Sequence, residues 1–151
     1  MPGEERPVIA WLQRLLRRKK SLPEHLKRGL WGEKVAEDAL KKKGYAILGR
    51  RVRMGKRGEL DLVAKQGETL VFVEVKTRAG EQFGRPFGAI KSHKKKMLMN
   101  AAKCYLLKLK ERPRYFRFDA VEVIGREGAG EPVVRHIESA IKITRKYRIQ
   151  W

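Results

Sequence analysis

Four charged side chains occupy positions from which they could act together on a substrate. Glu59 and Asp61 alternate with leucines, and Glu74 and Lys76 end a very apolar run a few residues further on. Side chains alternate along a strand, so each pair emerges on one face of its strand. If a short hairpin brings the two faces together, Asp61, Glu74 and Lys76 meet at one edge of the sheet, with Glu59 close by.

A carboxylate cluster of this kind favours a hard divalent cation, because unneutralised carboxylates repel one another and are costly to desolvate. Oxygen ligands alone suit Mg²⁺ or Mn²⁺. Such an ion polarises a scissile phosphate and lowers the pKa of a bound water, while Lys76 would orient that water or stabilise the charge that builds on the phosphate. Glu33, at the edge of the apolar face of a predicted helix, would hold a water on the metal. These residues predict a phosphodiesterase site.

Each of these residues also has a structural interpretation. A strand with alternating charges is usually half exposed and carries cross-strand ion pairs, and for Glu59 this weighs as much as a functional role. Glu33 could be an exposed helix residue beside the surface formed by Glu37 and Lys41. For Glu74 and Lys76, unpaired charges at the end of so apolar a run would be costly, and a salt bridge from Lys76 to a carboxylate is the remaining structural explanation.

The overall charge indicates a polyanionic partner. The chain has 37 Lys and Arg against 17 Asp and Glu, a formal charge of +20, which favours nucleic acid, although an anionic membrane surface would also satisfy it. Candidate phosphate contacts lie in a Gly-containing turn, directly after the acidic motif, and at the start of a basic helix. These contacts are Arg53, Lys56, Arg57, Arg78, Arg85, Lys91, Lys94, Lys95 and Lys96.

The elements that must position these side chains follow from periodicity. Helical spacing predicts helices at residues 30–43 and 90–110, and β-type runs predict strands at residues 45–52, 59–64, 70–76, 116–124 and 133–137. The order helix, three strands, helix, strands predicts a mixed α/β sandwich, with one domain at residues 29–141.

The two ends of the chain are predicted to lie outside that domain. Residues 1–28 form a basic N-terminal appendage, helical or disordered, in which residues 8–20 have an amphipathic pattern that could touch a phosphate backbone, a membrane or a partner. Residues 142–151 form a basic C-terminal tail. No run approaches a membrane span, no signal pattern follows Met1, and Cys104 is the single cysteine, so the sequence predicts a cytoplasmic protein without a transmembrane segment.

An ordered set of motifs across residues 29 to 141 resembles the YraN-like family of bacterial proteins. These motifs are Gly32-Glu33 with Ala36, Gly44-Tyr45, Gly58-Glu-Leu-Asp-Leu-Val-Ala64, Phe72-Val-Glu-Val-Lys-Thr-Arg78, Phe83-Gly84 with Pro86, Lys94, Ala101-Ala102 with Tyr105-Leu106, and Arg117-Phe-Asp119. That family is similar to archaeal Holliday junction resolvases and to the PD-(D/E)xK nuclease superfamily.

The resemblance implies a restriction-endonuclease-like fold, in which helices flank a central mixed sheet. It places the superfamily's catalytic residues at Asp61, Glu74, Lys76 and Glu33, and it gives the main-chain carbonyl of Val75 to the metal. A Mg²⁺- or Mn²⁺-dependent endonuclease acting on structured or branched DNA, in a homodimer, is the expected activity, and DNA is favoured over RNA. The alternative from another class is a non-catalytic nucleic-acid-binding module that retains the nuclease fold.

Overall fold

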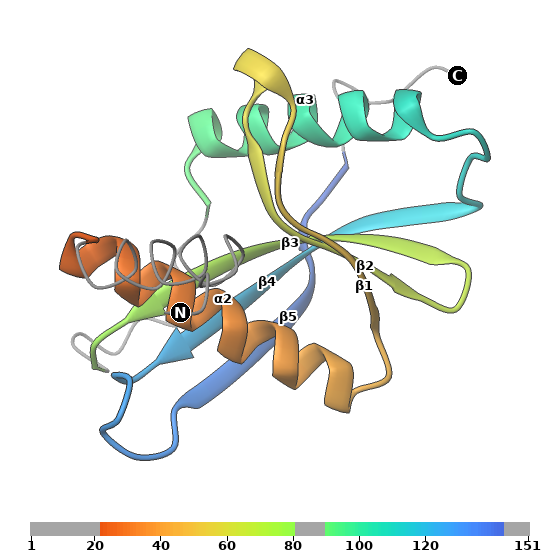
Figure 1. Cartoon of the computed structure of the whole chain (residues 1–151). Coiled ribbons are helices and arrows are strands. Elements are labelled where there is room, and N and C mark those ends of the chain that lie inside the picture. The colour runs from red at the N-terminus through yellow and green to blue at the C-terminus, as the bar shows by residue number, and fades with distance from the viewer. Residues whose placement is uncertain (1–21, 81–89, 144–151) are drawn as a thin grey trace, which may run out of the picture.

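The computed structural model, which describes residues 22–80 and 90–143, has three layers, with one helix on each face of a five-stranded sheet (Figure 1). In chain order the elements are α2 (Glu24–Lys42), β1 (Ala46–Arg53), the short 3-10 helix η1 (Gly55–Arg57), β2 (Glu59–Gln66), β3 (Thr69–Arg78), α3 (Ser92–Lys108), β4 (Tyr115–Ile124) and β5 (Val133–Ile141). The predicted α/β architecture of restriction-endonuclease-like type is confirmed.

The strands follow one another across the sheet in the order β1-β2-β3-β4-β5. Every neighbouring pair is antiparallel except β3 and β4, which run parallel. Parallel neighbours need a crossover connection, and α3 lies in that connection. The crossover carries α3 back across one face of the sheet, opposite the face that α2 covers (Figure 1).

Helix α2 begins six residues earlier than the periodicity predicted, at Glu24 instead of about Leu30. Pro23 falls within the segment predicted as an appendage, but it is the residue at the N-cap of this helix. Proline suits a helix start because it needs no hydrogen-bond acceptor for its nitrogen. The predicted stop is confirmed: the helix ends at Lys42, and Gly44 follows with a φ of 85°.

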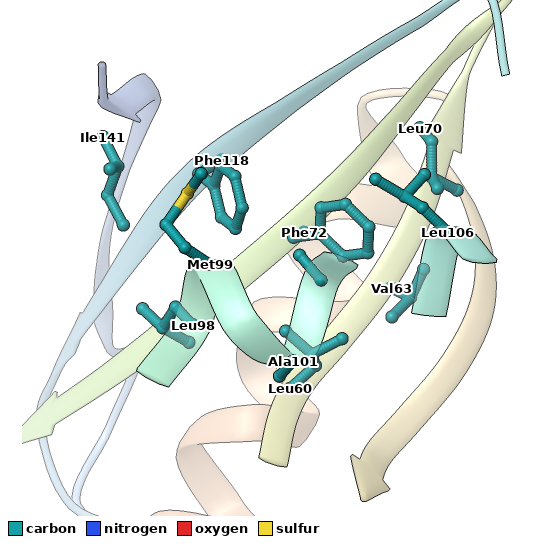
Figure 2. Close-up of a cluster of buried hydrophobic side chains, with 11 residues drawn as sticks. Leu60, Val63, Leu70, Phe72, Leu98, Met99, Ala101, Leu106, Phe118 and Ile141 are labelled. Carbon is teal, nitrogen blue, oxygen red and sulfur yellow. The ribbon is translucent and has the colours of Figure 1, made fainter. Parts of the chain in front are cut away.

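Each face of the sheet has its own apolar core. Between the sheet and α3, Phe72 and Phe118 of the central strands pack against Leu98, Met99 and Leu106 of the helix (Figure 2). The ring centroids of Phe72 and Phe118 lie 5.3 Å apart, and both side chains are nearly inaccessible to water. Full burial of one such side chain stabilises the fold by about 1.5–3 kcal/mol.

The core on the α2 face is made of smaller side chains. Ala36 and Leu40 of the helix pack against Val71 and Val73 of β3 and Val121 of β4. Small side chains let the helix approach the central strands closely, which brings its polar edge next to the sheet.

No helix within the described ranges is long and apolar enough to cross a membrane. The predicted amphipathic segment at residues 8–20 lies outside the described residues, and so does the tail beyond residue 143, so their suggested contacts stay predictions.

Candidate active site

A pocket opens where β2 and β3 separate. The two strands pair in register from Gln66 opposite Thr69 up to Leu62 opposite Val73. Beyond that point the Val75 N–H donates to Oδ2 of Asp61 over 2.8 Å, so a side chain takes the place of a main-chain partner. This bond orients the Asp61 carboxylate at the fork, the point where β2 and β3 stop pairing.

The fork also changes which face of the sheet β2 presents. Leu60 and Leu62 were predicted to share a face, but Leu60 packs in the core beside α3 and Leu62 in the core beside α2. The regular alternation therefore fails at Asp61, directly beyond the last pair between β2 and β3. The prediction that Asp61 and Glu74 come together is unaffected, since Asp61 sits one position beyond the last pair, facing Glu74.

The pocket has a volume of about 370 Å³ and an acidic floor. The described residues that line it are His25, Arg28, Gly29, Glu33, Asp61, Glu74, Val75, Thr77 and Lys94. Three of the four predicted catalytic residues therefore share one pocket. His25 and Arg28 belong to α2 and were not predicted, because they fall within the segment expected to be an appendage, residues 1–28.

Asp61 and Glu74 form the centre of this pocket. Burial raises the pKa of Asp61, and burial followed by the Asp61 charge raises the pKa of Glu74 to about 7. With both groups ionised, Oε2 of Glu74 is buried and meets no hydrogen-bond donor among the described residues. Two neighbouring carboxylates of this kind are stabilised by a shared proton or by a cation.

Glu33 reaches the same pocket from α2. Its side chain is 16% exposed, and burial followed by the charge of Asp61 raises its pKa to about 7, against the lowering effect of Arg51. The helix comes this close because Gly32 has no side chain: a Cβ there would overlap Oγ1 of Thr77 on β3 and lie 2.9 Å from its Cβ. Glu33 is thus placed by the residue that precedes it.

Glu59 takes part in ion pairs at the rim. Its carboxylate lies 2.9 Å from Nε of Arg53 and 3.4 Å from Nε of Arg51, which also contacts Glu33 at 3.3 Å. Arg51 has a φ of 46°, a left-handed conformation that turns it toward both acids. These contacts agree with the cross-strand interpretation of Glu59, and its role as a metal ligand stays a prediction.

The positions of Lys76 and Lys94 differ from the roles that the sequence predicted for them. Lys76 pairs in register with Glu122 of β4, its side chain is exposed, and it is absent from the described lining of the pocket. Lys94, predicted only as a phosphate contact, places Nζ 3.0 Å from Oε1 of Glu74. Burial would lower the pKa of Lys94, but the charges of Glu74 and Asp61 outweigh it and raise the value. An ammonium from α3 therefore contacts the site.

The predicted phosphate contacts divide into groups. Arg78 pairs with the buried carboxylate of Glu122 at 3.1 Å, which gives it a structural partner. The turn that carries Lys56 and Arg57 packs against α3, where a Cβ on Gly58 would meet the Met97 carbonyl at 3.5 Å (Figure 1).

Other predicted contacts lie close to that turn or beyond the described ranges. Lys91 and Lys96 are exposed at the start of α3, and Lys95 is half-buried. The turn and the helix therefore form one basic surface next to the pocket. Arg85 is outside the described residues.

A second polar cluster lies at the β4–β5 junction and is structural. Asp119 is buried and accepts hydrogen bonds from Arg117, His136 and the Ser139 N–H at 2.8 to 3.1 Å. Burial would raise the pKa of Asp119, but these bonds outweigh it and lower the value. Nζ of Lys43, a pure donor, lies 3.2 Å from Nδ1 of His136, so Nε2 carries the hydrogen given to Asp119.

The geometry limits what the pocket could hold. Within residues 22–80 and 90–143, no three His, Cys, Asp or Glu side chains lie together as a ready metal cage. Mg²⁺ does not need one, since it is usually bound by one or two carboxylates and completes its shell with water and phosphate oxygens. Asp61 and Glu74 fit that requirement, since Oε2 of Glu74 is buried without a hydrogen-bond partner in the described part of the chain.

A mixed sheet covered by one helix on each face, with a carboxylate pocket where two central strands diverge, defines a protein of the restriction-endonuclease-like class. The model of the family described as "Uncharacterised protein family UPF0102" matches residues 32–123. The chain therefore belongs to the UPF0102 family, and the resemblance drawn from its motifs is confirmed.

Individual relatives show how much of the chain is shared. A UPF0102 protein of Syntrophomonas wolfei is 42% identical over 115 residues, which is 74% of this chain and 95% of the relative. A UPF0102 protein of Clostridium acetobutylicum is 39% identical over 117 residues, 78% of this chain and 95% of the relative. One from Symbiobacterium thermophilum is 46% identical over 92 residues, 61% of this chain and 77% of the relative.

Proposed function

We propose that this protein is a divalent-metal-dependent endonuclease that acts on structured or branched DNA. One observation carries the proposal: Oε2 of Glu74 is buried beside Asp61 without a hydrogen-bond donor among the described residues, in a chain with a net charge of +20. A paired-carboxylate site is costly in any protein, and a strongly basic surface attracts a polyanion to it.

Asp61 and Glu74 would hold the ion, Mg²⁺ or Mn²⁺, with the Val75 carbonyl as a further ligand. When bound, the ion supplies polarisation of the scissile phosphate and a lowered pKa for an attacking water. The Val75 N–H keeps Asp61 in one orientation, and such preorganisation favours catalysis because the ligand need not be ordered during the reaction.

Glu33 is suited to act on the attacking water. A general base works best when its pKa lies near the working pH, and burial beside Asp61 raises the pKa of Glu33 to about 7. Arg51 contacts Glu33 at 3.3 Å and holds its side chain toward the pocket. In this proposal Glu33 orients the water and accepts its proton.

The substrate would lie along the basic surface of the turn and α3. Lys56 and Arg57 of the turn, with Lys91 and Lys96 of the helix, would contact phosphates without reading bases. Binding through such contacts weakens steeply as salt rises. A homodimer would let two pockets cut paired strands, and that assembly rests on the family resemblance alone.

A second candidate is a nucleic-acid-binding module without catalysis. The observation that favours it is the lack of a three-ligand cage among the described residues, together with the Lys94–Glu74 ion pair, which partly neutralises the pocket. In this case the acids would stabilise the fork between β2 and β3.

Cleavage assays separate the two candidates. Labelled four-way-junction, flap, single-stranded and duplex DNA are incubated with Mg²⁺ or Mn²⁺ and with wild-type, Asp61→Asn or Glu74→Gln protein, while Glu68→Gln serves as an exposed control. Metal-dependent cutting that both pocket variants lose and the control keeps supports the endonuclease. Binding without cutting, equal in all four proteins, supports the module.

A further inference from the structure

Lys94 is the cation that the structure places in direct contact with the carboxylate of Glu74. It lies in the first turn of α3, and its Nζ is 3.0 Å from Oε1 of Glu74. The Glu74 side chain is 15% exposed, whereas that of Lys94 is 44% exposed. One member of the pair is therefore fixed in the pocket, and the other reaches in from the solvent side on a flexible stem.

The contact leaves the pocket incompletely neutralised. The ammonium covers one oxygen of Glu74, while Oε2 stays buried without a donor among the described residues and Asp61 adds a second negative charge. A divalent ion between the two carboxylates would neutralise both acids, which one ammonium cannot do. The two cations therefore compete for the same carboxylate.

We propose that Lys94 is a resident counter-cation of Glu74, which a divalent ion displaces and which then contacts a phosphate of the bound nucleic acid. This inference rests on the proposed function, because it requires the pocket to take a divalent ion. It adds a regulatory property to that function: without metal the ammonium is held by the protein, and with metal it becomes available to the substrate.

The surroundings of Lys94 allow this exchange. The lysine stem has four carbons and rotates freely once its ammonium is released, and the exposed Lys91 lies one helical turn earlier on the surface where a phosphate backbone would run. Lys76 is less suited to this role, since it pairs in register with Glu122 and is absent from the described lining of the pocket.

The first test is the affinity of Mn²⁺ for the full-length protein without nucleic acid, measured by isothermal titration calorimetry. Lys94→Gln removes the competing charge and should bind Mn²⁺ about tenfold more tightly than wild type. Lys94→Arg keeps the charge and should bind it like wild type. Lys103→Gln, an exposed position on the same helix, controls for the loss of one positive charge and should also match wild type.

The second test measures the salt dependence of binding to phosphorothioate duplex DNA, whose strands are checked to be intact on denaturing gels after each titration. With Mn²⁺ present, Lys94→Gln should lower the slope of log affinity against log salt by about 0.9, the value of one phosphate contact. Without Mn²⁺ the slope should equal that of wild type, because Glu74 then holds the lysine.

The outcomes distinguish this inference from the proposed function. Mn²⁺ binding to wild type that Lys94→Gln leaves unchanged or weakens overturns the inference alone, as does a change in slope that is equal with and without Mn²⁺. Absence of Mn²⁺ binding in every variant overturns the proposed function and the inference with it.

Discussion

Replacing Gly32 by alanine should damage the fold and the carboxylate pocket together. Alanine normally favours a helix over glycine by about 0.5–1 kcal/mol. At this position, however, a Cβ would overlap Oγ1 of Thr77 and lie 2.9 Å from both its Cβ and its Cγ2. The conflict involves the root of a side chain on a central strand, so either α2 or β3 must shift.

A matched control sets the magnitude. Gly29 lies three residues earlier in the same helix, and a Cβ there would have no atom within 4 Å. Gly29→Ala should raise the free energy of unfolding by about 0.5–1 kcal/mol. The free energy of unfolding of Gly32→Ala should be about 1–3 kcal/mol lower than that of Gly29→Ala, which is the usual cost of overpacking. For a domain of this size, each kcal/mol corresponds to about 2–4 °C in Tm.

Urea unfolding of both variants gives the free energies, and a rescue experiment checks the cause. Thr77→Ala in the Gly32→Ala background would leave two Cβ atoms in conflict, whereas Thr77→Gly removes every overlapping atom and should restore part of the loss. Mn²⁺ affinity should fall in Gly32→Ala, because Glu33 moves with the helix. A Gly32→Ala protein as stable as Gly29→Ala would refute the close approach of α2 to β3.

Three further predictions concern charge. The pKa values of Glu33 and Glu74 are raised to about 7, so the folded protein holds more protons than the unfolded chain between about pH 4.5 and 7. Without metal, the free energy of unfolding should therefore fall as pH rises through that window. Thermal melts should show that Mg²⁺ raises Tm more at pH 8 than at pH 5. Asp119→Ala leaves a buried network without its acceptor and should lower the free energy of unfolding by about 3–5 kcal/mol. The exposed Asp38→Ala should lower it by at most about 1 kcal/mol. Urea titration compares the two variants, and equal losses of stability would contradict the network's role. Lys56→Gln should weaken binding to all DNA sequences alike and lower the salt slope by about 0.9 in anisotropy titrations, and an unchanged slope would remove this residue from the interface.

The central hairpin could be predicted because local signals determine it. Two β-type runs flank a short connection in which Gly67 has a φ of 57°, so the turn fixes the antiparallel register. Continued by one position beyond Leu62 and Val73, that register brings Asp61 next to Glu74, although the regular alternation of side chains fails at Asp61. The proximity of these acids therefore depends on few residues, all of them close in sequence.

Features that depend on tertiary packing could not be predicted. The contact of Lys94 with Glu74 arises because the crossover to the parallel strand β4 returns α3 across the sheet, and no local pattern specifies where its first turn will lie. Leu60 and Leu62 lie in opposite cores, on either side of the position where the pairing of β2 with β3 ends, and the sequence pattern does not reveal that position. His136 meets Asp119 through the irregular register of β4 and β5, which strand periodicity does not reveal.

The start of α2 shows how one residue can be interpreted in two ways. Proline ends a helix when it lies inside one, but it also occurs at the first positions of a helix. The predicted appendage extends past Pro23 to residue 28, whereas the helix begins directly after this proline at Glu24. The extra turn matters for function, because it carries His25 and Arg28 to the pocket.

The most direct test of the carboxylate site is a crystal structure of the wild-type protein grown with Mn²⁺, with data collected at a wavelength where manganese scatters anomalously. We predict one strong anomalous peak between the carboxylates of Asp61 and Glu74, at oxygen distances of about 2.0–2.3 Å, with Lys94 withdrawn from Glu74. A pocket without a peak, in which the Lys94–Glu74 ion pair persists at saturating Mn²⁺, would contradict a metal-dependent site.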